Sequence, residues 1–303
     1  MKSPVTGGNR VELITTFPTD SIVKIYQDNL KVDTRRFFKG VPAVELYECT
    51  ETGYRFYHPE TILGDGQFYA DLHKDNEGYY SKTRWEHKYA IGQIKATDKV
   101  LEVGAGDGFF LEQLKKANID ALGLELNQDA IAKGAKKGLR MSGEMIEDHA
   151  AAHPETYDVV CCFQVLEHIY NVKSFLDGCI KALKKGGKLI IAVPNNNPYM
   201  FKQDKWHTLN LPPHHAGLWN KKAFMELQNF YNITPQDIIV EPLSNMKPFA
   251  KQWYLAQRNY FKETKPVLGG IMSLVPRPVY KAVVKLFSPW IDGCNIVAVF
   301  TKN

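Results

Sequence analysis

Three glycines and two acidic residues form the most informative chemical pattern in this sequence. The stretch VLEVGAGDGFF, residues 100–110, carries Gly104, Gly106 and Gly108 between an apolar run and a helical pattern. Glycine has no β-carbon, so such a turn lets a ligand lie directly against the backbone. The G-x-G-x-G spacing differs from the G-x-G-x-x-G of dinucleotide-binding loops, which disfavours a pyrophosphate ligand.

The two acids indicate what kind of ligand this is. Glu125 ends the next apolar run, where a carboxylate can accept hydrogen bonds from both hydroxyls of a ribose. Glu102 lies inside the apolar run before the loop, and burying a carboxylate is costly unless it organises the loop or meets a cation. A cationic nucleoside would supply that cation. We expect the acids and glycines to serve this ligand rather than packing.

A second pattern with chemical potential is LNLPPHHAGLWN, residues 209–220, in which two prolines stiffen the chain before His214 and His215. Neutral imidazole accepts a proton near pH 7, so these histidines are candidate general bases. His168, in the stretch LEHI, is the rival base. The alternative is that the histidines cap a helix or pair with backbone groups.

Alternating strands and helices must position these residues. The strand-like runs KVLEVGA, DALGLEL, YDVVCCF and GKLIIAVPN alternate with helical segments at 109–116, 130–137 and 172–184. This order predicts an α/β fold with a doubly wound, mostly parallel sheet and helices on both faces. Loops beyond the carboxyl ends of such strands carry the site, so the loop with His214 and His215 should face the glycine turn.

Two further regions flank this core. Residues 1–75 mix short β-type runs with turn residues, without a persistent helical period, and predict a small β-rich segment. Residues 244–291 contain five prolines and predict several short helices before the last strand, NIVAVFTK. The predicted organisation is a segment 1–75, a central domain 76–243 with 292–303, and an inserted helical cap 244–291.

Four motifs in order, VLEVGAGDG, LGLELN, YDVVCCFQVLEHI and LKKGGKLIIAVPN, resemble class I S-adenosylmethionine-dependent methyltransferases over roughly residues 97–200. The LEH motif is similar to that of the sugar, natural-product and quinone O-methyltransferases. The resemblance implies a Rossmann-like sheet with an antiparallel last strand and S-adenosylmethionine as cofactor. The cofactor-binding set that we expect is Tyr80, Arg84, Glu102, Gly104, Ala105, Gly106, Glu125, Leu126, Met145, Ile146 and Gln164.

The resemblance also implies roles within this set. The backbone from Gly104 to Gly106 would lie along the methionine and ribose, and Glu125 would bind the ribose hydroxyls. Met145 and Ile146 would flank the adenine, and Gln164 would lie beside the sulfonium. Tyr80 and Arg84, on the helical segment before the first strand, could reach the carboxylate of the cofactor, although Arg84 could equally serve only the surface.

Methyl transfer requires an aligned acceptor and removal of its proton, without a covalent enzyme intermediate. Cys161 and Cys162, central in a strand-like run, are therefore expected to be core residues. We expect an oxygen acceptor on a small or carbohydrate-like molecule, bound by residues 197–220 and the insertion. The rings that could face a sugar, or could simply be core, are Tyr199, Phe201, Trp206 and Trp219.

Other functions stay open at this stage. Some small-RNA and quinone methyltransferases hold a divalent ion with E-x-x-E-H, but Gln164 replaces the first acid here, so no metal is expected. An RNA acceptor, a quinone or lipid-linked acceptor, and a non-catalytic cofactor-binding module are the alternatives. The net charge of +5 comes from interspersed lysines, which gives little support to nucleic-acid binding.

Composition bounds the class of protein. With 303 residues, 44% of them hydrophobic, the chain can bury a full core. The five cysteines form no CxxC pair, which favours a reducing cytoplasm over a disulfide framework. We find no signal-peptide pattern, and no run reaches the roughly 18 apolar residues of a membrane-spanning helix.

Two stretches have a weaker resemblance or pattern. LYECTETGYRFYHP is similar to half of a small zinc-binding ribbon, but Thr52 stands where a second cysteine would follow Cys49, which predicts a metal-free relic. VLGGIMSLVPRPVYKAVVKLFSPWI joins apolar residues to Arg277, Lys281 and Lys285. This stretch is either a cap on the domain or an interfacial helix that makes peripheral contact with acidic lipid.

Overall fold

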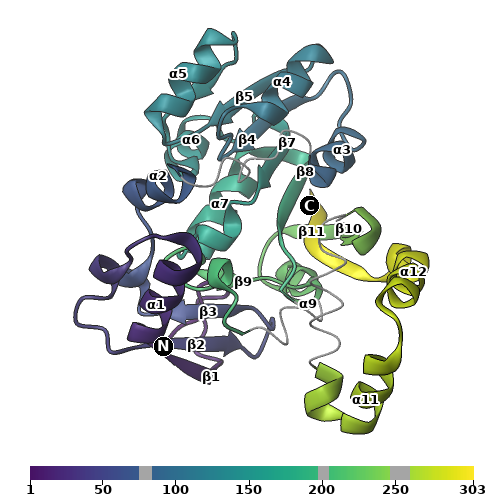
Figure 1. The fold of residues 1–303 in the computed structure, drawn as a ribbon. Coiled ribbons are helices and arrows are strands. Elements are labelled where there is room, and N and C mark those ends of the chain that lie inside the picture. Colours follow the sequence, from purple (N-terminus) through teal and green to yellow (C-terminus); the bar gives the residue numbers. More distant parts are fainter. Residues whose placement is uncertain (75–83, 197–204, 246–259) are drawn as a thin grey trace.

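The computed structural model describes residues 1–74, 84–196, 205–245 and 260–303. A seven-stranded sheet in the order β10-β11-β8-β7-β4-β5-β6 forms its centre (Figure 1). The strand β11 runs antiparallel to both of its neighbours, and the pairs among β8, β7, β4, β5 and β6 are parallel, which confirms the predicted sheet. The strands are β4 (Lys99–Val103), β5 (Asp120–Leu124), β6 (Met141–Ser142), β7 (Tyr157–Phe163), β8 (Leu183–Pro194), β10 (Ile233–Pro242) and β11 (Asp292–Lys302).

Helices cover both faces of this sheet, because the side chains of each buried strand alternate between two apolar cores. Cys161 contributes to one core and its neighbour Cys162 to the other, and both are fully buried, as expected for core residues. The cores pack against α3 (Trp85–Ile91) and α4 (Phe109–Lys116) on one face and α6 (Ile146–Ala152), α7 (Val172–Ala182) and α9 (Lys221–Glu226) on the other, while α5 (Gln128–Lys136) follows β5.

The N-terminal segment forms a small antiparallel sheet in the order β1-β2-β3-β9. Its fourth strand, β9 (Gly217–Leu218), directly follows the loop that carries His214 and His215. The expectation that no helical period persists in this segment is wrong, because α1 buries Ile22 and Tyr26 one helical turn apart. The segment contains β1 (Val11–Pro18), α1 (Thr19–Leu30), β2 (Ala43–Cys49), β3 (Arg55–His58) and α2 (Gly66–Lys74).

A third apolar core joins this segment to residues 206–218. Ile22 and Tyr26 of α1 pack in one cluster with Leu211 and Leu218. The Tyr26 hydroxyl donates a buried hydrogen bond of 2.7 Å to the carbonyl oxygen of Leu211, three residues before His214. The N-terminal segment therefore braces the histidine-bearing loop.

The insertion before β11 consists of short helices, as its prolines predicted. The structure describes α11 (Pro266–Leu274) and α12 (Arg277–Phe287), each with a proline in its first turn, where the missing N–H costs nothing. Pro248 lies outside the described residues. No individual helix in the described ranges has both the length and the apolar character needed to cross a membrane.

Candidate functional site

The glycine turn between β4 and α4 has the backbone that the sequence pattern requires. Gly104, Gly106 and Gly108 have φ angles of 75°, 51° and 78°, in the left-handed region that favours glycine. A β-carbon at Gly104 would collide with Val165, and one at Gly108 would collide with Leu139. The expectation that the glycines serve no packing purpose is therefore wrong for two of the three.

Glu125 fastens this turn. The backbone N–H of Gly106 donates to its Oε2 at 2.8 Å, and the N–H of Asn127 donates to its Oε1 at 2.9 Å. Each carboxylate oxygen can accept a second hydrogen bond. Glu125 can therefore hold the turn and still accept from the two hydroxyls of a ribose.

Glu102 is a buried acid beneath the same turn. Burial, followed by the nearby charge of Glu125, raises the pKa of Glu102 well above its usual value, although the backbone of Leu111 and the guanidinium of Arg84 oppose this shift. Its Oε2 atom has no hydrogen-bond partner among the described residues. A buried carboxyl with one oxygen left unpartnered fits a site for a cationic ligand, as the sequence suggested.

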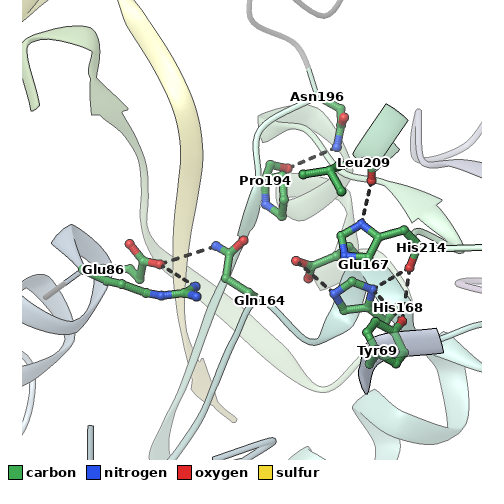
Figure 2. A network of polar contacts seen from close by, with 10 residues as sticks. Tyr69, Glu86, Gln164, Glu167, His168, Pro194, Asn196, Leu209 and His214 are labelled. Atoms are coloured by element: carbon green, nitrogen blue, oxygen red, sulfur yellow. Dashed lines mark hydrogen bonds and ion pairs between the residues drawn. The ribbon is translucent and has the colours of Figure 1, made fainter. Parts of the chain in front are cut away.

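Arg84 and Gln164 both contact Glu86, a residue that the sequence analysis missed, and Figure 2 shows Gln164 beside Glu86. An Arg84 guanidinium nitrogen and the Gln164 Nε2 atom each lie 3.5 Å from Glu86 Oε1. Gln164 follows β7 with a φ of 56°, a left-handed conformation that is uncommon outside glycine and frequent at functional sites. The signal for Glu86 was an acid on the core-facing side of an amphipathic helix.

The remaining members of the expected cofactor set differ in exposure. Leu126 and Met145 follow the carboxyl ends of the paired strands β5 and β6, and both are exposed apolar side chains. Ala105 is buried in the turn, and Ile146 is buried in the core next to α7. Of the pair Met145 and Ile146, which we expected to flank the adenine, only Met145 has an exposed side chain. Tyr80 lies outside the described residues.

Three histidines, His168, His214 and His215, gather at the adjacent strand end, and Figure 2 shows the first two of them. His168 closes the short 3-10 turn Leu166–His168 after β7, and its Nδ1 lies 2.6 Å from the carbonyl oxygen of His214. The Nδ1 of His214 lies 2.8 Å from the carbonyl oxygen of Leu209. Ring centroids are 4.8 Å apart for His168 and His214, 5.0 Å for His168 and His215, and 4.5 Å for His214 and His215.

In the histidine cluster, His168 with His214 and His215, the last two side chains are buried and His168 is partly buried. Burial lowers the pKa of His168 to about 4. Burial and then the neighbouring imidazoles lower the pKa of His215 well below its usual value, while burial raises the pKa of Glu167 to about 8. Closely spaced imidazoles repel one another when charged, so the cluster can hold one proton more readily than two.

The same cluster has the composition of a metal site, although the sequence analysis expected no metal. One ligand atom from each of the three histidines lies within 4.8 Å of the others. Tyr69 of α2, a second residue missed from the sequence, lies with its hydroxyl 3.2 Å from His168 Nδ1 and 3.3 Å from the His214 carbonyl oxygen. It brings the N-terminal segment into contact with the cluster.

The glycine turn and the histidine cluster are neighbours because β4 and β7 are adjacent parallel strands. Their carboxyl ends lead into Gly104 and Gln164, and the close approach of Gly104 to Val165 joins the two turns. His168 follows three residues later. The structure thus brings the predicted cofactor loop and the predicted bases to one edge of the sheet.

Of the aromatic residues expected to face a sugar, the two that the structure describes lie in different apolar cores. Trp219 is fully buried, with its ring 4.4 Å from that of Tyr54 and 4.8 Å from that of Phe224, so it belongs to the core. Trp206 packs edge-on against Phe17 at 5.0 Å in the N-terminal core. Tyr199 and Phe201 lie outside the described residues.

Comparison with known proteins places these motifs in a family. A family model described as a methyltransferase domain matches residues 77–234. A ubiquinone biosynthesis O-methyltransferase from Thiobacillus denitrificans is 30% identical over 165 residues, 52% of this chain and 66% of that protein. One from Aliivibrio fischeri is 33% identical over 111 residues, 34% of this chain and 47% of that protein. This chain therefore spans about half to two thirds of the curated relatives that it matches.

Among solved structures, a SAM-dependent methyltransferase from Archaeoglobus fulgidus is 15% identical, with a TM-score of 0.52 over 78% of this chain and all of that one. At this identity the likeness concerns the fold alone. The family model, in contrast, covers more than half of the chain and includes the glycine turn, Glu125 and the LEH motif. The chain belongs to the methyltransferase-domain family, the class I S-adenosylmethionine-dependent methyltransferases.

Proposed function

We propose that this protein transfers the methyl group of S-adenosylmethionine to a hydroxyl of a small molecule of the quinone class. The observation that carries the proposal is the meeting of the glycine turn, fastened by Glu125, with the buried histidine cluster across the contact of Gly104 and Val165. The names of the relatives, ubiquinone biosynthesis O-methyltransferases, support the acceptor class. A carbohydrate-like acceptor has less support, because Trp219 is buried in the core.

In this proposal the cofactor, when bound, supplies a methyl group on a positively charged sulfur. Glu125 accepts from the ribose hydroxyls with the lone pairs that the turn leaves open. The unpartnered Oε2 of Glu102 would serve the cationic part of the cofactor, and Arg84 would bind the carboxylate of the cofactor. The exposed side chains of Leu126 and Met145 cover the adenine.

The acceptor proton passes to the histidine cluster, and we assign the general base to His214. Its Nδ1–H donates to the carbonyl of Leu209, which orients the opposite ring nitrogen as the proton acceptor and stabilises the imidazolium once formed. Burial lowers the pKa values of His168 and His215, which makes these two poor proton acceptors near pH 7. Their rings instead pack against His214 and exclude water from it.

The test is turnover on a catechol or hydroxyquinone acceptor. His214→Ala should lower kcat by roughly 10²-fold or more, the usual scale for loss of a general base, with nearly unchanged affinity for S-adenosylhomocysteine. His153→Ala, which removes an exposed histidine after α6, is the matched control and should leave kcat unchanged. Wild-type turnover in His214→Ala would refute the assignment, and His215→Ala and His168→Ala would then be compared.

A metal-assisted form of the same transfer is the second candidate. It is favoured by one observation: one ligand nitrogen from each of the three histidines lies within 4.8 Å of the others, the spacing of a metal site. Elemental analysis and chelation separate the two forms. The general-base form predicts turnover that resists EDTA, whereas the metal form predicts bound metal in stoichiometric amount and turnover that EDTA abolishes and added divalent metal restores.

A further inference from the structure

Helices α11 and α12 expose an unusual amount of apolar surface. Nine of the sixteen large apolar side chains exposed in the described part of the chain lie between residues 267 and 290, which is far more than an even distribution would give. Val267 is 78% exposed, Leu274 83% and Trp290 78%. The others are Leu268, Ile271, Val279, Val283, Leu286 and Phe287. Contiguous exposed apolar side chains of this size indicate an interaction surface.

The interpretation of this stretch as a cap packed on the domain does not account for these side chains. Only one side of α12 packs against the rest of the protein. Tyr280 and Val284, one turn apart, are buried with Leu243 and Cys294 beside β10 and β11. Val279, Val283 and Leu286 follow helical spacing on another side and are exposed. Figure 1 shows α12 next to β10 and β11, with α11 beyond it at the rim of the molecule.

The charge of the same stretch is of one sign. Between Glu263 and Asp292 the sequence has no acidic residue and four basic ones, Lys265, Arg277, Lys281 and Lys285. The lysines among them are exposed. A second copy of this chain would bring like charges together, whereas an apolar surface with negative charge would be complementary to the patch.

We propose that α11 and α12 form a docking surface for an anionic lipid bilayer. The nine exposed apolar side chains enter the boundary between headgroups and acyl chains, while the flexible lysine side chains remain at the depth of the lipid phosphates. The two helices are inclined to each other by 110°, so they lie on the bilayer as two short segments. This docking does not depend on the acceptor proposed above.

The experiment is co-flotation of the full chain with vesicles of phosphatidylcholine alone or mixed with phosphatidylglycerol. The wild type should bind only the mixed vesicles, and binding should weaken as salt screens the charges. Lys281→Gln with Lys285→Gln should weaken binding on the order of 20-fold, because each basic residue near an anionic surface contributes about fivefold. Lys116→Gln with Lys136→Gln changes the net charge equally at exposed sites on α4 and α5, and should have no comparable effect.

The apolar contribution is tested separately. Leu274→Ser with Leu286→Ser should weaken binding by at least about tenfold, since both side chains are withdrawn from the bilayer. Leu13→Ser with Ile14→Ser is the matched control, because these two residues are also exposed, at 52% and 48%, but lie on β1. Thermal unfolding should be unchanged in all these variants. The proposal is overturned if the wild type does not bind anionic vesicles, or if the α11 and α12 variants bind as the wild type does. It is also overturned if sedimentation shows a dimer that the Leu274 and Leu286 substitutions dissociate.

Discussion

At the scale of single residues, His87 of α3 is the buried histidine that most clearly links the fold to pH. Its ring lies 5.1 Å from that of Phe110 and 4.8 Å from that of Phe163, and its Nδ1 has no partner among the described residues. Burial, helped by the charge of Arg84, lowers its pKa from 6.5 to about 4. The folded protein therefore keeps His87 neutral where the unfolded chain takes up a proton.

The sign of the pH effect follows from this shift. Above pH 6.5 His87 is neutral in both states and its contribution is fully present; it is lost as the pH falls from about 6.5 to about 4. The loss in free energy of unfolding should be roughly 3 kcal/mol at most. Denaturant unfolding at pH 7 and pH 4.5 should show a smaller loss in His87→Phe than in the wild type. An equal loss in both proteins would contradict this account.

Only some residues of the site could be predicted from the sequence. Gly104, Gly106 and Glu125 could be predicted, because their types and spacing reflect local backbone chemistry. Glu86 and Tyr69 could not, because their role arises from helices that meet the strand ends only in the folded chain. For Trp219 the sequence left a sugar-facing and a core position open, and only the folded chain decides for the core, where the rings of Tyr54 and Phe224 enclose it.

At the scale of elements, the turns after β4 and β7 are coupled by the contact of Gly104 with Val165. Gly104→Ala should lower the free energy of unfolding by about 1–3 kcal/mol, through left-handed strain and the collision of the new β-carbon with Val165. Adding Val165→Ala should recover part of this loss. Gly186→Ala is the matched control, because Gly186 has the same φ of 75° with no atom near its β-carbon position. A cost no larger than that of Gly186→Ala would show that the turns are not coupled.

The helix α1 should influence turnover although it lies outside the sheet. Tyr26→Phe removes the hydrogen bond to the Leu211 carbonyl, and should cost about 1 kcal/mol of stability and lower kcat by loosening the His214 loop. Tyr231→Phe removes an equally buried hydroxyl that donates to the Val5 carbonyl at 2.6 Å, away from that loop. We expect both variants to lose stability and only Tyr26→Phe to lose kcat. Equal kcat values in the two variants would contradict a bracing role.

Elements with strong periodicity were predicted closely, and those fixed by long-range pairing were not. The helix 109–116 and the strand YDVVCCF coincide with α4 and β7, because apolar spacing alone determines them. The two-residue strand β9 has no local signal, since only its pairing with β3 defines it. The helix α1 did have such a signal in Ile22 and Tyr26, which the β-type runs around it obscured.

At the scale of the whole molecule, two parts of the chain build the candidate site at the carboxyl ends of the central strands, and the insertion forms a separate surface. The sheet supplies the glycine turn and the LEH motif, and the N-terminal segment holds the histidine loop through Tyr26 and Tyr69. The insertion lies on the side of β10 and β11 (Figure 1), and nine of its large apolar side chains are exposed. The expectation that the stretch around Cys49 is a zinc ribbon that has lost its metal stays a prediction.

The central claim is that the glycine turn and Glu125 bind S-adenosylmethionine, and isothermal titration calorimetry with S-adenosylhomocysteine tests it most directly. We predict one binding site per chain in the wild type. Glu125→Ala should weaken binding by roughly tenfold or more, because the ribose loses its acceptor and the Gly106 N–H loses its partner. Asp129→Ala, an exposed acid in the first turn of α5, should bind as the wild type does. No measurable binding by the folded wild type, or equal affinity in Glu125→Ala, would contradict the account.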